Sequence, residues 1–408
     1  MTLSLAKDKI RFVLLEGIHP QADALLTQAG YENIQRVDGA VDADQLNTLI
    51  RDAHFLGIRS RTQLDAEALS KAERLIGIGC FCIGTDQVSL ADATAAGVPV
   101  FNAPFANTRS VAELVLAEII LLMRGIPERN AAAHRGEWLK HAVGSHEVRG
   151  KTLGIVGYGH IGSQLGILAE GLGMRVTYYD IISKLPLGNA TPMATLDELL
   201  QRSDVVSLHV PETPETESMI GAKQIHQMRL GTHLINASRG RVVDLSALKA
   251  ALTSGHIASA AIDVFPSEPK NKDQRFENEL CGLDNVLLTP HIGGSTQEAQ
   301  ENIARDVIGK LIRYSDNGST TGAVNFPEVA LPDHAGARRI MHIHRNEPGV
   351  LNAINTLISE QAINIAAQYL QTQSDLGYVV MDVETKDTSS LIKALSEIPG
   401  TIKTRTLY

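Results

Sequence analysis

The sequence is poor in the residues that mark several classes of protein. It has three cysteines and one tryptophan among 408 residues, and aromatic residues make up only 4% of it. Cys80, Cys82 and Cys281 form neither a disulfide framework nor a zinc-binding set, so we expect a reducing, cytoplasmic environment and no metal. No stretch approaches the roughly 18 apolar residues that cross a bilayer, and the N-terminus lacks the apolar segment of a signal peptide.

An excess of positive charge is also missing. Lys and Arg number 37 against 46 Asp and Glu, which gives a formal net charge of −9. Non-specific nucleic-acid binding depends on a basic surface, so we expect neither a nucleic-acid partner nor, without an apolar span, a membrane one. An anionic substrate would require positive charge gathered locally. The hydrophobic fraction of 44% and the length favour a globular protein of two or three domains.

Short apolar runs alternate with amphipathic segments, and this pattern occurs twice. The first series predicts strands at 11–15, 55–58, 75–78 and 98–101, and helices at 19–29 and 86–96. A helix predicted at 110–124 is apolar enough to be buried nearly all round. The second series predicts strands at 152–156, 175–179, 204–209, 233–236, 260–263 and 286–288. Together they predict two doubly wound, Rossmann-like α/β lobes with a cleft between them.

A third unit follows a predicted linker at 328–337. Its predicted strands are 339–344, 365–371, 378–384 and 401–407, and its predicted helices are 349–360 and 388–397. The order βαββαβ is that of a ferredoxin-like domain.

Gly157, Gly159 and Gly162 form a GxGxxG motif between a predicted strand and a predicted helix. In that context the first glycine permits a tight turn, the second lets a pyrophosphate approach the backbone, and the third lets the helix pack on the strand. The amides of His160 and Ile161 would then face the phosphates at the positive end of the helix.

Asp180 ends the next predicted strand, about twenty residues further on. A carboxylate at this position accepts hydrogen bonds from the ribose hydroxyls and repels a 2′-phosphate, which favours NAD over NADP. The alternative is that Asp180 only terminates a strand.

Three later predicted strands are each followed by a reactive side chain: Arg239 in NASRG, Glu268 before a proline, and His291 in TPHIGG. The carboxyl ends of the strands meet at one edge of an open α/β sheet, so we expect these side chains to converge. His291 suits a general base, Glu268 would orient it and raise its pKa, and Arg239 would hold a substrate carboxylate. Taken singly, a surface histidine or an arginine in a turn is the ordinary explanation; together they favour hydride transfer on a 2-hydroxy acid.

The order of these motifs resembles the D-isomer-specific 2-hydroxyacid dehydrogenase family as far as about Pro327. The resemblance implies that Arg239, Glu268 and His291 are catalytic. It implies an NAD site formed by Gly157, Gly159, His160, Ile161, Gly162, Asp180, Ala237, Ser238, Arg239, Asp263, His291, Ile292, Gly293 and Gly294. The expected domains are a substrate-binding domain at 1–106 and 296–327, an NAD-binding Rossmann domain at 107–295, and a regulatory domain at 338–408.

Within that family the chain is similar to the branch that oxidises D-3-phosphoglycerate to 3-phosphohydroxypyruvate, opens L-serine biosynthesis and carries one C-terminal ACT domain. The signs are the Arg59-Ser-Arg61-Thr sequence, the segment 102–113 and the terminal unit. The resemblance implies that Arg59 and Arg61 bind the substrate phosphate, although a solvated charged loop is the ordinary alternative. It also implies that the backbone at Ile83 and Gly84 holds the substrate carboxylate, and that Lys140 reaches a neighbouring subunit's site. A phosphate site would also admit a second carboxylate, so 2-oxoglutarate reduction is an expected side activity.

For the ACT domain the resemblance implies feedback inhibition by L-serine, bound where two such domains meet in a homotetramer. His344 and Asn346 would come from one subunit and Asn364 from its partner. Asn346 is also placed to cap a helix that Pro348 opens. Gly293, Gly294 and Gly336 would supply a flexible hinge.

Two other functions compete with this one. Another D-2-hydroxyacid dehydrogenase, acting on glyoxylate, formate or D-lactate, would need neither Arg59, Arg61 nor the C-terminal domain. An NAD-sensing transcriptional co-repressor would keep the fold and is disfavoured by the serine-type ACT unit.

Overall fold

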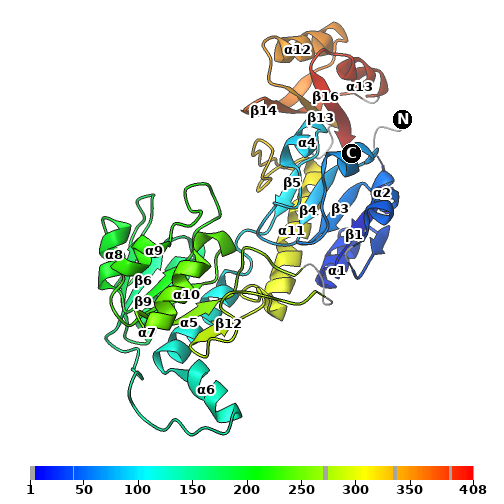
Figure 1. The fold of residues 1–408 in the computed structure, drawn as a ribbon. Helices are drawn as coiled ribbons and strands as arrows, with labels where there is room; N and C mark the ends of the chain where they lie inside the picture. Colours follow the sequence, from blue (N-terminus) through cyan, green and yellow to red (C-terminus); the bar gives the residue numbers. More distant parts are fainter. Residues whose placement is uncertain (1–4, 40, 270–273, 334–337, 386–387, 408) are drawn as a thin grey trace. The chain divides into compact units, whose positions relative to one another are not determined.

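The computed structural model describes residues 5–39, 41–269, 274–333, 338–385 and 388–407. Its contacts divide the chain into two compact units (Figure 1). Unit 1 combines Met1–Ala106 with Gln300–Tyr408, and unit 2 is Asn107–Ala299. In the part of the chain that the structure describes, no helix combines the length and apolarity needed to cross a membrane.

Unit 1 begins with a parallel five-stranded sheet in the order β2-β1-β3-β4-β5. Its strands are β1 Phe12–Leu14, β2 Ile34–Arg36, β3 Phe55–Ile58, β4 Gly77–Cys80 and β5 Val100–Asn102. Its helices are α1 Gln21–Gln28, α2 Ala43–Arg51, α3 Ala66–Ser70, α4 Leu90–Ala95 and, from much later in the sequence, α11 Gln297–Asn317. The strand order changes direction between β1 and β3, which makes this point the expected ligand-binding edge of the sheet.

Helix α11 packs on this sheet closely over Gly79 of β4 (Figure 1). A Cβ on Gly79 would lie 2.7 Å from Val307 and 3.0 Å from Leu311, and one on Gly77 would lie 2.9 Å from the Phe55 ring. Glycine at position 79 therefore permits the close approach of α11 to β4, and glycine at position 77 leaves room for the Phe55 ring. The buried aromatic rings of β1, β3 and β5 form one apolar core with α11.

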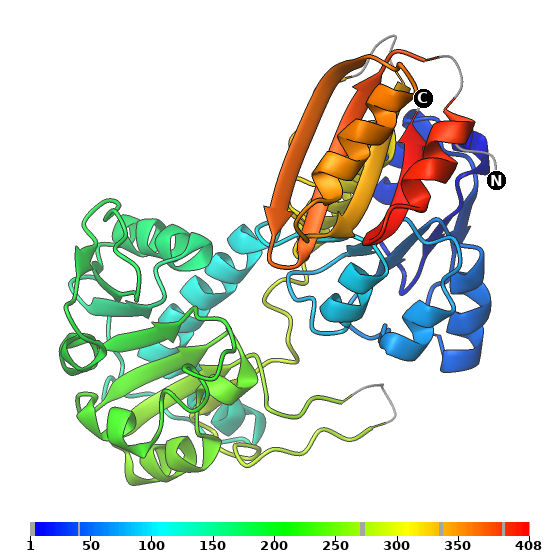
Figure 2. The same cartoon turned by 90° about the horizontal axis from the view of Figure 1, so that it is seen from above.

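The C-terminal part of unit 1 is an antiparallel sheet in the order β14-β15-β13-β16 with two helices on one face (Figure 2). Its elements are β13 Arg338–Arg345, α12 Val350–Glu360, β14 Ile365–Gln373, β15 Leu376–Val383, α13 Ser389–Ser396 and β16 Thr401–Leu407. The predicted βαββαβ order is confirmed. The predicted cap by Asn346 is wrong, because α12 begins at Val350 and its N-cap is Gly349, with φ of +97°. The predicted hinge residue Gly336 lies outside the described residues.

A buried ion pair holds β13 to its surroundings in unit 1. Arg339 is fully buried, and its Nε and Nη2 donate to the Asp382 carboxylate at 2.6 and 2.7 Å. Its Nη1 donates to the carbonyl oxygens of Asn317, at the end of α11, and of Pro332. Such a fully hydrogen-bonded arrangement is what makes a buried charge tolerable.

Unit 2 is built around a seven-stranded sheet in the order β12-β11-β10-β9-β6-β7-β8, whose paired strands run parallel. The strands are β6 Thr152–Val156, β7 Arg175–Tyr179, β8 Thr191–Pro192, β9 Val205–Leu208, β10 Thr232–Asn236, β11 Ile257–Ile262 and β12 Val286–Leu288. The helices are α5 Thr108–Met123, α6 Ile126–His134, α7 His160–Gly171, α8 Leu196–Arg202, α9 Ala222–Gln227 and α10 Leu245–Ser254. The order reverses between β6 and β9, as in a dinucleotide-binding fold, so the predicted α/β class is confirmed.

Candidate active site

The predicted glycine motif forms the turn between β6 and α7. Gly157 has φ of +91°, and a Cβ there would collide with the carbonyl oxygen of His209 at the end of β9. A Cβ on Gly162 would collide with the carbonyl oxygen of Gly157. Both positions therefore require glycine, one for the turn and one for the packing of α7 on β6.

Gly159, by contrast, faces open space, because no atom lies within 4 Å of a Cβ built on it. Helix α7 begins at the next residue, His160, so the first helical amides, including that of Ile161, open beside this space. An uncovered backbone at the positive end of a helix is the shape that a pyrophosphate needs. The turn therefore fits the phosphates of NAD.

Asp180, directly after β7, is held in place by backbone donors. Its Oδ2 accepts a hydrogen bond from the Tyr158 amide at 2.8 Å, and its Oδ1 accepts one from the Ile182 amide at 2.9 Å. The Tyr158 ring stacks on Tyr178 with centroids 3.9 Å apart. Asp180, which we predict to bind the ribose, is thereby fixed to the glycine turn through Tyr158 and to the following loop through Ile182.

The loop after β10 presents Arg239. Asn236 accepts hydrogen bonds from the amide (3.1 Å) and hydroxyl (2.7 Å) of Ser238, and its side-chain amide donates to the Arg239 carbonyl at 3.0 Å. Gly240 then passes so close to the backbone of Phe265 that a Cβ would collide with it. This contact joins the NASRG loop to the loop that carries Glu268.

Asp263, after β11, organises the histidine loop. Its Oδ1 accepts from the Thr289 hydroxyl (2.6 Å) and the Ile292 amide (2.8 Å), and its Oδ2 accepts from the Gly293 amide (2.8 Å). The His291 amide donates to the Asp263 carbonyl at 2.9 Å. Three hydrogen bonds from the histidine loop thus occupy the Asp263 carboxylate. A contact of Asp263 with NAD stays a prediction.

His291 and Glu268 form a hydrogen-bonded pair. The Nδ1 atom lies 3.0 Å from Oε2 and 3.1 Å from Oε1 of Glu268. This hydrogen bond raises the pKa of His291, against the opposing effect of burial. Burial alone would raise the pKa of Glu268, but the hydrogen bond and charge of His291 outweigh it, and the pKa is lowered. The charge of Arg239 acts on both groups, lowering both pKa values, so the three predicted residues share one site.

The geometry of the His291–Glu268 pair suits proton exchange. The His291 side chain is 53% exposed, while its Nδ1 is engaged by Glu268, so the rest of the imidazole remains accessible. His291 also has φ of +54°, an uncommon backbone conformation for a residue other than glycine, and such strain is typical of functional sites.

The other predicted cofactor residues lie on the same loops: Ala237 beside Ser238, and Gly294, where a Cβ would collide with the Asn107 side chain.

Glu118 is a further residue at this site that the sequence motifs did not single out. It is 1% exposed, and neither carboxyl oxygen has a hydrogen-bond partner among the described residues. Burial, followed by the charge of Asp263, raises its pKa to about 8. The sequence does indicate Glu118 in one respect, since it is an acidic residue within a predicted apolar helix.

The prediction that this helix is buried nearly all round is wrong. Helix α5 buries one face, and Ile120 is 39% exposed.

The predicted substrate residues of unit 1 follow neighbouring strands. Arg59 and Arg61 come after β3, and Ile83 and Gly84 after β4. Within the described residues, neither guanidinium has an ion-pair or hydrogen-bond partner, and Arg61 is exposed. Lys140 belongs to unit 2 and is exposed.

Within one chain, Asn364 lies far from the other two predicted regulatory residues, His344 and Asn346. His344 is 3% exposed on β13, with its Nδ1 3.3 Å from Nδ1 of His342. Asn346 donates to the carbonyl oxygen of Ser374, just beyond the end of β14, whereas Asn364 precedes the start of that strand and donates to a side chain after β15. Nine residues of strand, about 30 Å, therefore separate the two asparagines.

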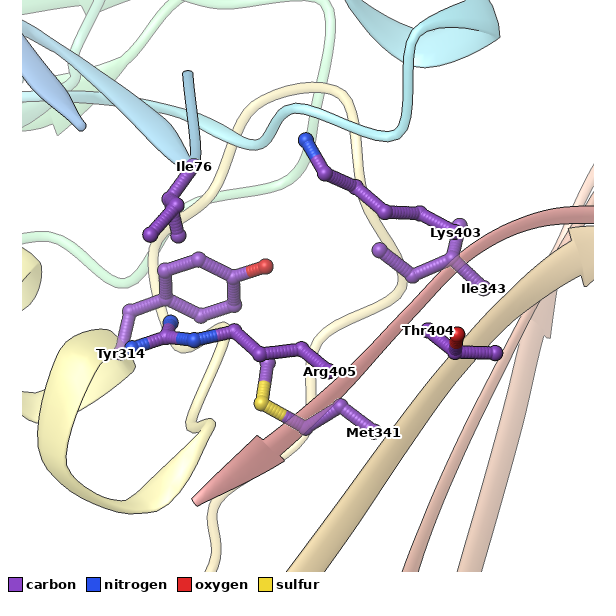
Figure 3. Close-up of a pocket in the computed structure, with 7 residues that line it drawn as sticks. All are labelled: Ile76, Tyr314, Met341, Ile343, Lys403, Thr404 and Arg405. Carbon is purple, nitrogen blue, oxygen red and sulfur yellow. The ribbon is translucent and has the colours of Figure 1, made fainter. Parts of the chain in front are cut away.

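A small cavity lies within unit 1 (Figure 3). It is lined by Ile76, Tyr314, Met341, Ile343, Lys403, Thr404 and Arg405. Its volume of about 10 Å³ holds at most one water molecule. It is too small to hold a substrate or an effector. No cluster of three or more side chains suited to a metal ion occurs among the described residues.

Comparisons with known proteins agree with this geometry. The profile described as D-isomer specific 2-hydroxyacid dehydrogenase, NAD binding domain, matches residues 116–293, and the profile of the AHAS small subunit-like ACT domain matches residues 340–403. The solved structure of the TT0316 protein from Thermus thermophilus has a TM-score of 0.67 and 31% identity, covering 74% of this chain and 96% of that chain. D-lactate dehydrogenase from Aquifex aeolicus, complexed with NAD and lactic acid, has a TM-score of 0.64 and 28% identity, covering 74% and 95%.

Relatives of similar length are closer in sequence. The D-3-phosphoglycerate dehydrogenase of Escherichia coli (strain K12) is 62% identical over 408 residues, covering 100% of this chain and 99% of that protein. The protein of the same name from Haemophilus influenzae is 59% identical over 406 residues, with the same coverage. These matches confirm the resemblance: the chain belongs to the D-3-phosphoglycerate dehydrogenases, a branch of the D-isomer specific 2-hydroxyacid dehydrogenase family.

Proposed function

We propose that this protein catalyses the NAD-dependent oxidation of D-3-phosphoglycerate to 3-phosphohydroxypyruvate, the first step of L-serine biosynthesis, in the cytoplasm. The single observation that carries the proposal is the His291–Glu268 pair, in which Nδ1 of His291 lies 3.0 Å from the Glu268 carboxylate. The charge of Arg239 acts on the pKa of this histidine. The names of the full-length relatives supply the substrate.

His291, Glu268 and Arg239 have different roles in the reaction of the hydroxy acid. NAD, held at the glycine turn and Asp180, supplies the hydride acceptor. His291 removes the proton of the 2-hydroxyl group, and the carboxylate of Glu268 stabilises the imidazolium that forms. Arg239 binds the substrate carboxylate and polarises the C2 oxygen through its planar guanidinium. In the reverse direction the protonated His291 donates to the carbonyl oxygen.

Arg59 and Arg61 bind the phosphate in this proposal, with Ile83 and Gly84 contributing backbone contacts to the carboxylate. Support comes from the two guanidiniums, which have no ion-pair or hydrogen-bond partner among the described residues and are available to an anion. A second carboxylate has similar needs, so 2-oxoglutarate reduction to 2-hydroxyglutarate is part of the proposal. Lys140 acts at a neighbouring subunit's site.

The ACT domain binds L-serine between two subunits of a homotetramer, and this binding inhibits the enzyme. A site that contains both Asn346 and Asn364 needs two chains, since about 30 Å of β14 separates them within one. His344 completes that site from the Asn346 side. Trp138, two residues before Lys140, is 84% exposed.

NADH oxidation tests the proposal, with 3-phosphohydroxypyruvate, hydroxypyruvate and glyoxylate compared with and without millimolar L-serine. We expect strong preference for the phosphorylated substrate and inhibition by serine, and an Asn364→Ala variant should keep the first and lose the second. Equal turnover of the unphosphorylated acids would overturn the substrate assignment. Undiminished turnover at saturating serine would overturn the regulatory one. Light scattering of the same samples should give the mass of four chains.

A further inference from the structure

Glu16 holds the loop that carries Arg59 and Arg61. It follows β1 and is 8% exposed. Its Oε1 accepts hydrogen bonds from the backbone amides of Arg59 (3.2 Å) and Thr62 (2.9 Å), and its Oε2 accepts one from the amide of Arg61 (3.1 Å). Three donors on one buried carboxylate satisfy its charge and fix the course of the loop.

The backbone conformation of Glu16 is uncommon for a residue other than glycine. Its φ is +62°, in the left-handed region that residues other than glycine seldom adopt, and such backbone persists where its surroundings require it. Strands β1 and β3 are neighbours at the point where the strand order of the first sheet reverses. Glu16 and the arginine loop therefore extend from the two strand ends where a ligand is expected.

Gln87 links this loop to the second predicted substrate loop. It is 7% exposed, and its side-chain amide donates to the carbonyl oxygen of Arg59 at 2.7 Å and, at a longer 3.5 Å, to that of Gly84. The loop after β3 and the loop after β4 are thus joined through one buried amide. We therefore expect a displacement of one loop to be transmitted to the other.

We propose that Glu16 is the positioning residue of the phosphate-binding loop, and that Gln87 couples this loop to the carboxylate-binding backbone at Gly84; this rests on the proposed function. Because Glu16 occupies three amides of the loop, they are not offered to the anion, and the phosphate is held by the guanidiniums of Arg59 and Arg61. Those side chains have no partners of their own among the described residues, so their placement depends on the backbone that Glu16 holds.

The test is a Glu16→Gln variant, in which an NH₂ group replaces one acceptor and faces a backbone donor. We expect KM for 3-phosphohydroxypyruvate to rise at least about tenfold, with kcat and the KM for NADH within about twofold of the parent. The ratio of kcat/KM between 3-phosphohydroxypyruvate and hydroxypyruvate should fall by the same factor, which a general loss of folded enzyme would not produce. Asp65→Asn is the matched control: Asp65 caps the nearby helix α3 through the Ala68 amide at 2.9 Å and should leave the ratio unchanged.

Two further variants separate the possible failures. If Arg61→Gln leaves the preference for the phosphorylated substrate intact, the phosphate assignment itself fails. If Arg61→Gln abolishes the preference and Glu16→Gln does not change it, the role of Glu16 is overturned while the proposed function stands. Should Glu16→Gln fail to fold, Gln87→Met still tests the coupling between the two loops. It removes the donor that links the loops and should lower the same ratio by about threefold, and an unchanged ratio would refute the coupling.

Discussion

The buried carboxyl of Glu118 should make the stability of unit 2 depend on pH. Its pKa rises from the ordinary value of 4.5 to about 8 in the folded chain. Below pH 4.5 the group is protonated whether the chain is folded or unfolded, so it has no effect. Between pH 4.5 and about 8 the Glu118 carboxyl ionises only in the unfolded chain, so the free energy of unfolding falls as the pH rises. At 1.36 kcal/mol per pKa unit, the destabilisation is about 3 kcal/mol at pH 7 and about 5 kcal/mol above pH 8.

A Glu118→Gln variant removes this dependence, because an amide does not titrate. We expect its thermal unfolding midpoint, measured at pH 5, 7 and 8.5 by circular dichroism, to gain on that of the parent as the pH rises. Glu113→Gln is the control on the same helix, since Glu113 is exposed and pairs with Arg109. A difference between the Glu118 variant and the parent that is the same at all three pH values would refute the reasoning.

Two other predictions concern the catalytic pair and the ion pair of β13. Glu268→Gln removes the hydrogen-bonded charge that raises the pKa of His291, so the protonated form is lost at a lower pH and the alkaline decline of keto-acid reduction should move to lower pH. A profile of kcat/KM against pH that coincides with the parent's would show that Glu268 does not act on His291. Asp382→Asn leaves the fully buried Arg339 without its counter-charge and should cost about 3–5 kcal/mol. We expect a lower thermal midpoint with NADH affinity unchanged, and an unaltered midpoint would contradict this.

Signals carried by adjacent residues made much of the fold predictable. The apolar runs at 55–58, 152–156, 175–179 and 286–288 coincide with β3, β6, β7 and β12. The glycine spacing after β6 predicted the turn into α7, because the residues that form this turn are close together in the sequence. The edge strands β2 and β8 were missed, since they are two or three residues long and neither is buried.

Other features depend on contacts between distant parts of the chain. The three amides that Glu16 binds lie 43 to 46 residues away, and no pattern around Glu16 indicates them. Asp263 has the same character, because its partners follow the next strand of the sheet. The Asn346 cap was predicted from spacing alone and failed, because the backbone of Gly349 begins the helix instead.

The discontinuous makeup of unit 1 sets the order in which the chain can mature on the ribosome. The sheet of the first 106 residues depends on Val307 and Leu311 of α11 to cover Gly79, whereas unit 2 is one continuous segment. At 5–20 residues per second, about 10–40 s pass between the synthesis of the sheet and that of its covering helix. Unit 2 therefore completes its core first, and the nascent N-terminal segment, with an uncovered apolar face, is a natural client for chaperones during translation.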